Sequence, residues 1–147
     1  MKRFRILFCG LCAAAVLGFI GLLLIGSILV SPRPSIIGVP PQNLPIEIVE
    51  ISKGDDGLTH GWFLQGQLDK AGILLLHGVG ANRVEMLDRA RFLFSAGYSV
   101  LLIDMQAHGE TIGDHITFGV LESIDVHSSI EYLRNRVNNK IGIIGSC

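Results

Sequence analysis

The stretch Ile141-Gly142-Ile143-Ile144-Gly145-Ser146-Cys147 is a short apolar run that leads into a glycine, a serine and a cysteine. Apolar runs of this length are typical of strands covered on both faces, as in a parallel sheet. We therefore expect a strand over residues 141–144, with Cys147 placed just beyond its carboxyl end. Residues 73–76 and 98–103 have the same character and predict two further buried strands.

Two amphipathic segments separate these three runs. The first is expected to begin near Asn82, whose side chain suits a helix cap, with Glu85 three residues later as in a capping box. Gly97 is expected to end this helix. The second helix is predicted over residues 121–137. Strands that alternate with helices favour an α/β fold, here a parallel βαβαβ sheet with helices on both faces.

An antiparallel hairpin is predicted to lead into this sheet. Residues 46–51 alternate apolar and polar side chains with one slip in phase, which suggests a strand with a bulge. Residues 54–57 (Gly-Asp-Asp-Gly) form a strong turn signal, and residues 60–64 are a plausible second strand. The globular domain is therefore expected to cover residues 46–147.

The N-terminal segment differs from the rest of the chain. Lys2, Arg3 and Arg5 precede a run over residues 6–30 that holds no charged residue. About 20 apolar residues cross a bilayer, whereas a cleaved signal has an apolar region of roughly 7–15 residues. We therefore favour an uncleaved single-pass anchor over a cleaved signal. The basic cluster predicts a cytoplasmic N-terminus and a domain on the outer side.

The anchor and the domain are joined by a proline-rich segment. Residues 31–45 contain all five prolines of the chain, and proline is excluded from helix interiors and central strands. The expected organisation is thus a basic tip and transmembrane anchor over 1–30, an extended spacer over 31–45 and the domain over 46–147.

Composition excludes several classes of function. Lys and Arg number 12 and Asp and Glu 13, and no basic patch interleaved with aromatic residues points to nucleic acid. The three cysteines cannot form a disulfide framework, and two of them, Cys9 and Cys12, fall inside the apolar run. We expect no cofactor. The expected partners are the bilayer, through residues 6–30, and a small-molecule or peptide substrate.

Three loops follow the three buried strands, at the sheet edge where α/β proteins bind their ligands. They are His77-Gly78-Val79-Gly80-Ala81-Asn82, the segment from Asp104 to Thr111 with its Asp-x-x-x-His-Gly-Glu pattern, and Gly145-Ser146-Cys147. Their order and spacing resemble the α/β-hydrolase superfamily, in its esterase and peptidase-like branch. The resemblance covers about residues 46–147, the N-terminal half of such a fold.

The resemblance implies a role for each loop. Aligned on Gly145, the nucleophile position of the Gly-x-nucleophile-x-Gly elbow is Cys147, where serine is commoner. The oxyanion loop would be His77 to Gly80, with the backbone N–H of Val79 as one donor and with Gly78 and Gly80 allowing close approach. The implied activity is nucleophilic acyl transfer on an ester, a thioester or a peptide bond.

The same resemblance places the triad acid and histidine after the nucleophile. We therefore expect a fold that is incomplete over these residues, truncated before the acid and the histidine, and a chain without meaningful activity of its own. None of the five histidines is assigned the role of the missing triad histidine. His77 and His108 are expected to form local hydrogen bonds, and His115 is expected to be exposed.

Other interpretations remain open at this point. Gly78-x-Gly80 could begin a dinucleotide-binding unit with Asp104 on the ribose, but Arg83 stands where the third glycine is required. A metal site from Asp104, His108 and His115 matches no ligand spacing that we can support. A membrane-anchored remnant without catalysis is the remaining alternative.

Overall fold

The computed structural model describes the backbone of residues 2–137 and 140–146, with side chains from Gly10 onward. The chain divides into two units, Met1–Ser31 and Pro32–Cys147. The first is a single helix, α1 (Lys2–Leu29), in which Gly10–Leu29 is long and apolar enough to cross a membrane. This result rests on length and composition, which anchors and signal sequences share.

The second unit is built on a five-stranded sheet in the order β2-β3-β5-β4-β7. Strands β2 (Ile46–Ser52) and β3 (Leu58–Leu64) form an antiparallel hairpin, and β3 also pairs antiparallel with β5 (Ser99–Ile103). Strand β4 (Gly72–Leu76) runs parallel to β5 on one side and to β7 (Ile141–Gly145) on the other. The predicted lead-in hairpin and parallel strands are confirmed.

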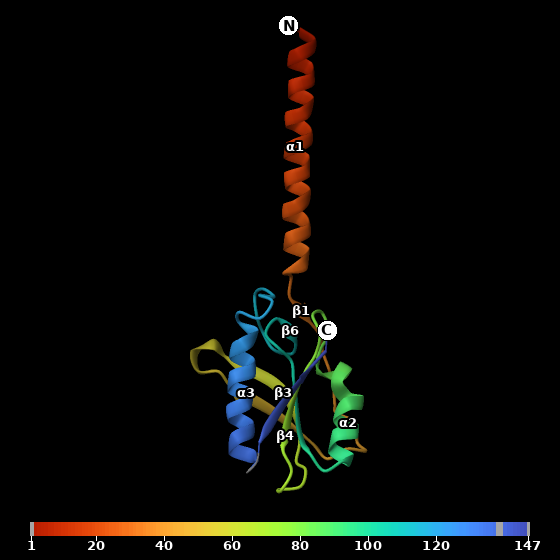
Figure 1. The fold of residues 1–147 in the computed structure, drawn as a ribbon, viewed down its shortest axis with the longest axis vertical. Coiled ribbons are helices and arrows are strands. Elements are labelled where there is room, and N and C mark those ends of the chain that lie inside the picture. The colour runs from red at the N-terminus through yellow and green to blue at the C-terminus, as the bar shows by residue number, and fades with distance from the viewer. Residues whose placement is uncertain (1, 138–139, 147) are drawn as a thin grey trace. The chain divides into compact units, whose positions relative to one another are not determined.

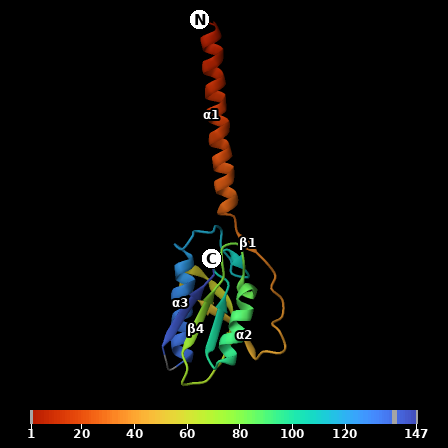
Figure 2. The same cartoon turned by 45° about the vertical axis from the view of Figure 1, so that its right-hand side comes forward.

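Two helices cover opposite faces of the sheet, α2 (Leu87–Ser95) and α3 (Glu122–Arg136), as Figures 1 and 2 show. Side chains alternate between the two faces of a strand. Accordingly, Leu101 and Ile103 pack in the cluster under α3, while Val100 and Leu102 pack in the cluster under α2. Burial on both faces explains why the central strands are continuously apolar.

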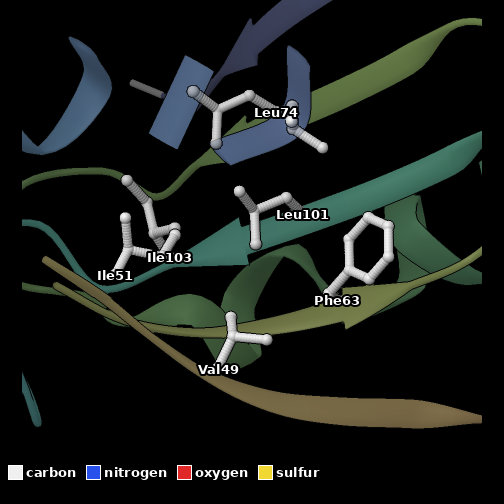
Figure 3. Close-up of a cluster of buried hydrophobic side chains, with 7 residues drawn as sticks. Val49, Ile51, Phe63, Leu74, Leu101 and Ile103 are labelled. Atoms are coloured by element: carbon white, nitrogen blue, oxygen red, sulfur yellow. The ribbon is translucent and has the colours of Figure 1, made fainter. Parts of the chain in front are cut away.

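The cluster under α3 joins the hairpin to the parallel strands (Figure 3). Leu133 of α3 closes it, and both Phe63 and Leu74 are completely buried within it. Each such side chain contributes about 1.5–3 kcal/mol of hydrophobic stabilisation relative to an exposed position. The sheet that carries the loops is therefore stabilised by this apolar cluster.

The expected bulge in the first strand is wrong. The pairing runs one to one from Ile46 opposite Leu64 to Ser52 opposite Leu58. The alternation slips because this strand places apolar side chains on both faces of the sheet. Val49 packs on one face and Ile46 packs on the other. Both faces of this sheet are apolar, so the strand needs no extra residue.

The start of the first domain helix also differs from expectation. The Asn82 side chain accepts a hydrogen bond from the Val84 N–H (3.0 Å), which confirms the cap. The next residues form one 3-10 turn, η2 (Arg83–Met86), before α2 begins. Glu85 does not complete a capping box, since its carboxylate accepts hydrogen bonds from the Gly78 N–H and the Ser146 hydroxyl.

The proline-rich segment is attached to the domain. Its first residues form β1 (Arg33–Pro34), which pairs in parallel with β6 (His108–Gly109) in the loop after β5. The Arg33 N–H donates to the Ala107 carbonyl (2.7 Å), and the Ser35 N–H donates to the Gly109 carbonyl (2.8 Å). Residues 33–35 are therefore held against the domain, whereas residues 42–44 form a turn.

Candidate active site

The loops predicted to share one edge of the sheet do meet there. Residues 77–82 follow β4, residues 104–111 follow β5, and Ser146 follows β7. Together with residues 116–122 they surround a pocket of about 450 Å³. Most of the pocket wall is apolar and comes from side chains such as Leu76, Met105 and Ile116.

The turn after β4, which lines this pocket, holds a backbone donor at Val79 that stays unpaired among the described residues. The Gly78 N–H donates to Glu85 Oε2 (3.1 Å), and the Gly80 N–H donates to His108 Nε2 (3.0 Å). The N–H of Val79, between them, has no partner within the part of the chain that the structure describes. The segment forms a loop after the strand, as predicted, and the N–H groups of Gly78 and Gly80 hold this loop in place.

Glu85 was predicted to complete a capping box, but its carboxylate instead links two turns at the pocket. Its carboxylate joins the turn after β4 to the turn after β7, where it accepts from the Ser146 hydroxyl at 3.1 Å. Hydrogen bonds from the Gly78 N–H and then from Ser146 lower the pKa of Glu85. The carboxylate is therefore charged at neutral pH and holds both turns.

Two histidines brace the same edge from inside. His108 Nε2 accepts from the Gly80 N–H, and His77 Nε2 accepts from the Met105 N–H (3.1 Å). The Nδ1 atoms of both rings lie 2.8–2.9 Å from backbone carbonyl oxygens of their own loops. Each ring is thus neutral, with Nδ1–H as donor and Nε2 as acceptor. Neither ring has a nitrogen left to serve as a general base.

A buried ionic cluster fixes the second loop beneath the pocket. Arg83 is 1% exposed, forms an ion pair with Asp104, which is fully buried, and forms another with Glu110. The Arg83 guanidinium also lies 5.0 Å from the centre of the Trp62 ring. Asp104 accepts from the backbone N–H groups of Arg83 and Glu110 as well, at 2.7 and 2.9 Å. The hydrogen bond from Arg83 lowers the pKa of Glu110.

These partners exclude two of the alternatives raised by the sequence. A carboxylate at Asp104 that is buried and saturated by donors has no oxygen for a ribose or a metal ion. Gly109 is packed so closely that a Cβ there would lie 2.2 Å from the Asp104 carboxylate. His115 is exposed, as expected, and its backbone carbonyl accepts from the Gln106 side chain.

A second buried carboxylate, Asp125 of α3, supports the loop from the other face. It accepts from Lys53 Nζ at 2.9 Å, from the Thr59 hydroxyl at 2.6 Å and from the Gln106 N–H at 2.7 Å. The sequence reading missed Asp125 because a carboxylate on a helix ordinarily faces solvent. The only indication in the sequence that Asp125 has a special role was its position in the first turn of α3.

Glu122 contributes a carboxylate to the pocket wall. Burial raises its pKa, but hydrogen bonds from Thr117 and the Gly119 N–H outweigh that effect and lower it. The side chain thereby ties the segment that carries Phe118 to the first residue of α3. Its oxygens are occupied by this role.

The predicted nucleophile position, Cys147, lies outside the described residues. The preceding residue is well placed, because the Ser146 N–H donates to the Leu76 carbonyl (2.9 Å) and continues the pairing of β7 with β4. Ser146 therefore lies near the turn that holds Val79, since both residues line the same pocket.

Lowering the pH is expected to destabilise the domain through His77. Burial is the largest cause that lowers its pKa below 6.5, and protonation would also oppose the Met105 N–H. The unfolded chain therefore binds more protons below about pH 6.5, so stability is full above that value and falls as the pH drops towards the folded-state pKa. Urea midpoints between about pH 7.5 and 5.5 measure this effect. His77→Gln should flatten the profile, and an unchanged slope would contradict the assignment.

Solved structures with a similar fold include several hydrolases. An esterase from Pyrococcus furiosus, Pf2001, superposes with a TM-score of 0.68 and 28% identity, over 78% of this chain and 48% of its own. An α/β serine hydrolase without lid from Xanthomonas campestris gives a TM-score of 0.54 at 17% identity, over 74% and 52%. The chain resembles the α/β-hydrolase superfamily.

The hydrolase resemblance covers part of that fold. The chain spans about half the length of the esterase, at 48% of that chain. An uncharacterized protein of Bacillus subtilis, YqkD, is 30% identical over 73 residues, which are 50% of this chain and 24% of YqkD. No family model matches the chain.

Proposed function

We propose that these residues form the oxyanion half of a membrane-anchored α/β hydrolase that cleaves an ester, a thioester or a peptide bond by nucleophilic acyl transfer. Cys147 would be the nucleophile and the Val79 N–H one oxyanion donor. Gly78 and Gly80 would shape the turn, and residues 6–30 would cross the membrane with the N-terminus in the cytoplasm.

The unpaired N–H of Val79 is the observation that carries this proposal. A donor with no internal partner costs free energy unless solvent or a ligand satisfies it, and the N–H groups on either side of it are both satisfied. The turn is braced by Glu85 and His108, so the donor is held in place before any substrate binds. Such preorganisation is what stabilises the oxyanion of acyl transfer.

These 147 residues alone are expected to show no turnover of a p-nitrophenyl ester. The two histidines at the pocket, His77 and His108, have both ring nitrogens engaged by the backbone, so neither can relay a proton from a thiol. The longest natural polypeptide that contains these residues is expected to turn the ester over, and Cys147→Ala should abolish that activity.

Two results would count against this. Multiple turnovers by the 147 residues that vanish in Cys147→Ala would show that a group inside them serves as base. An inactive natural polypeptide would favour the remnant without catalysis.

The membrane assignment predicts that the chain stays with membranes during extraction with alkaline carbonate. An apolar helix that spans the bilayer resists this treatment, because it is held by burial of its side chains in lipid rather than by charge. A variant that carries lysine at Leu17 and Leu23, in the middle of Gly10–Leu29, is the matched control and should be released. Release of the parent chain into the soluble fraction would refute the anchor.

A further inference from the structure

Exposed apolar side chains gather at the mouth of the pocket. Phe118 and Val120 are 61% and 72% exposed, and Leu121 beside them is also exposed. Phe118 and Gly119 line the pocket itself. Single exposed apolar residues need no explanation, but a contiguous group beside a ligand pocket marks a contact surface. We call Phe118, Val120 and Leu121 the mouth patch.

The proline-rich segment ties this same edge of the domain to the end of α1. Arg33 and Ser35 are hydrogen-bonded to the loop after β5, which also supplies Met105 and His108 to the pocket. Ile36 follows them and is 97% exposed. The segment that leads to the N-terminal helix is therefore attached to the domain beside the pocket, at the carboxyl ends of the parallel strands, and not at their amino ends.

Chain connectivity limits how far this attachment can lie from the helix. α1 ends at Leu29 and β1 begins at Arg33. The four Cα-to-Cα steps from Leu29 to Arg33 span at most about 14 Å, and this bound holds for every angle between helix and domain. If α1 crosses a bilayer, the β1–β6 pairing stays close to the lipid surface.

We propose that the mouth patch rests on the bilayer surface and that the pocket opens towards lipid. The inference rests on the proposed membrane-anchored hydrolase, and it narrows the substrate class to apolar acyl compounds that partition into the membrane. The apolar wall of the pocket fits such a substrate. The Glu122 carboxylate in that wall disfavours anionic substrates, because like charges repel at short range.

Depth-dependent quenching by lipid tests the mouth patch directly. The full 147-residue chain is reconstituted in phosphatidylcholine vesicles with brominated acyl chains. Trp62 is the single tryptophan and is 2% exposed, so it serves as the internal reference. Phe118→Trp and Val120→Trp report on the mouth patch. Leu68→Trp is the matched control. Leu68 is 68% exposed and lies on the loop before β4, at the amino end of that strand and away from the pocket loops.

The added fluorescence at positions 118 and 120 should be quenched several-fold more than that at 68. Equal quenching at the mouth patch and at Leu68, or none at the mouth patch, would overturn the proposal. A second outcome would also overturn it. If the fluorescence of the Phe118→Trp variant indicates burial that depends on protein concentration and not on brominated lipid, a second copy of the chain covers the mouth patch. The quenching readout needs no turnover. A quenched mouth patch, together with a longest natural polypeptide that does not hydrolyse the ester, would refute the hydrolase and still support the membrane contact of the mouth patch.

Discussion

Replacing Val79 by proline is expected to lower kcat for ester hydrolysis by roughly 10²–10³-fold, the usual effect of losing one oxyanion donor. Proline removes the N–H of residue 79, while the hydrogen bonds that hold the turn come from the N–H groups of Gly78 and Gly80. Glycine at 78 also tolerates the restriction that a following proline imposes. Since the donor acts on the transition state, kcat and kcat/KM should fall together.

Val79→Ala is the control, because it shortens the side chain and keeps the N–H. The assay uses the active natural polypeptide that carries these residues, with Trp62 fluorescence as a check that the domain is folded. An unchanged kcat in the proline variant would remove Val79 from the oxyanion site. An equal loss in the alanine variant would show that the side chain, 62% exposed at the pocket, is what matters.

Asp104→Ala is expected to destabilise the domain by about 3–5 kcal/mol, the usual result of breaking a buried ion pair from one side. The Arg83 guanidinium would remain buried opposite an empty site, and two backbone N–H groups would lose their acceptor. Urea denaturation of the full chain in detergent micelles, followed by Trp62 fluorescence, measures the change. Trp62 is suited to this because it packs against Arg83.

Two further variants separate the buried charge from general effects of mutation. Asp114→Ala removes an exposed carboxylate and should change stability by no more than about 0.5 kcal/mol. The double variant with Asp104→Ala and Arg83→Met should recover part of the loss, because no unpaired charge then remains buried. A midpoint for Asp104→Ala equal to that of Asp114→Ala would mean that the ionic cluster does not hold the loop.

Much of the fold could be predicted because it depends on local patterns. The run over residues 73–76 is apolar at every position, so it predicts a strand buried on both faces before any partner is known. The Asn82 cap could be predicted for the same reason, since the side chain satisfies an N–H two residues away. The parallel pairing of the three buried strands followed from their alternation with helices, whereas the order of the strands in the sheet came from the structure.

The braces of the candidate site could not be predicted in this way. Arg83 was interpreted only as a missing glycine, because nothing near it in the sequence indicates that it is buried. Its partners Asp104 and Glu110 stand 21 and 27 residues away. Asp125 likewise binds Thr59 across 66 residues. A charged side chain can be buried only where partners compensate its desolvation, and those partners meet only after the chain has folded.

The sequence by itself determined that three loops after three buried strands would share one edge of the sheet, with the turn from His77 to Gly80 among them. Only the tertiary structure decided which N–H of that turn stays free. Gly78 and Gly80 are paired by Glu85 and His108, so Val79 alone remains among these three. Strand formation depends on the periodicity of neighbouring residues, whereas the satisfaction of a hydrogen bond depends on atoms that the folded chain brings within about 3 Å.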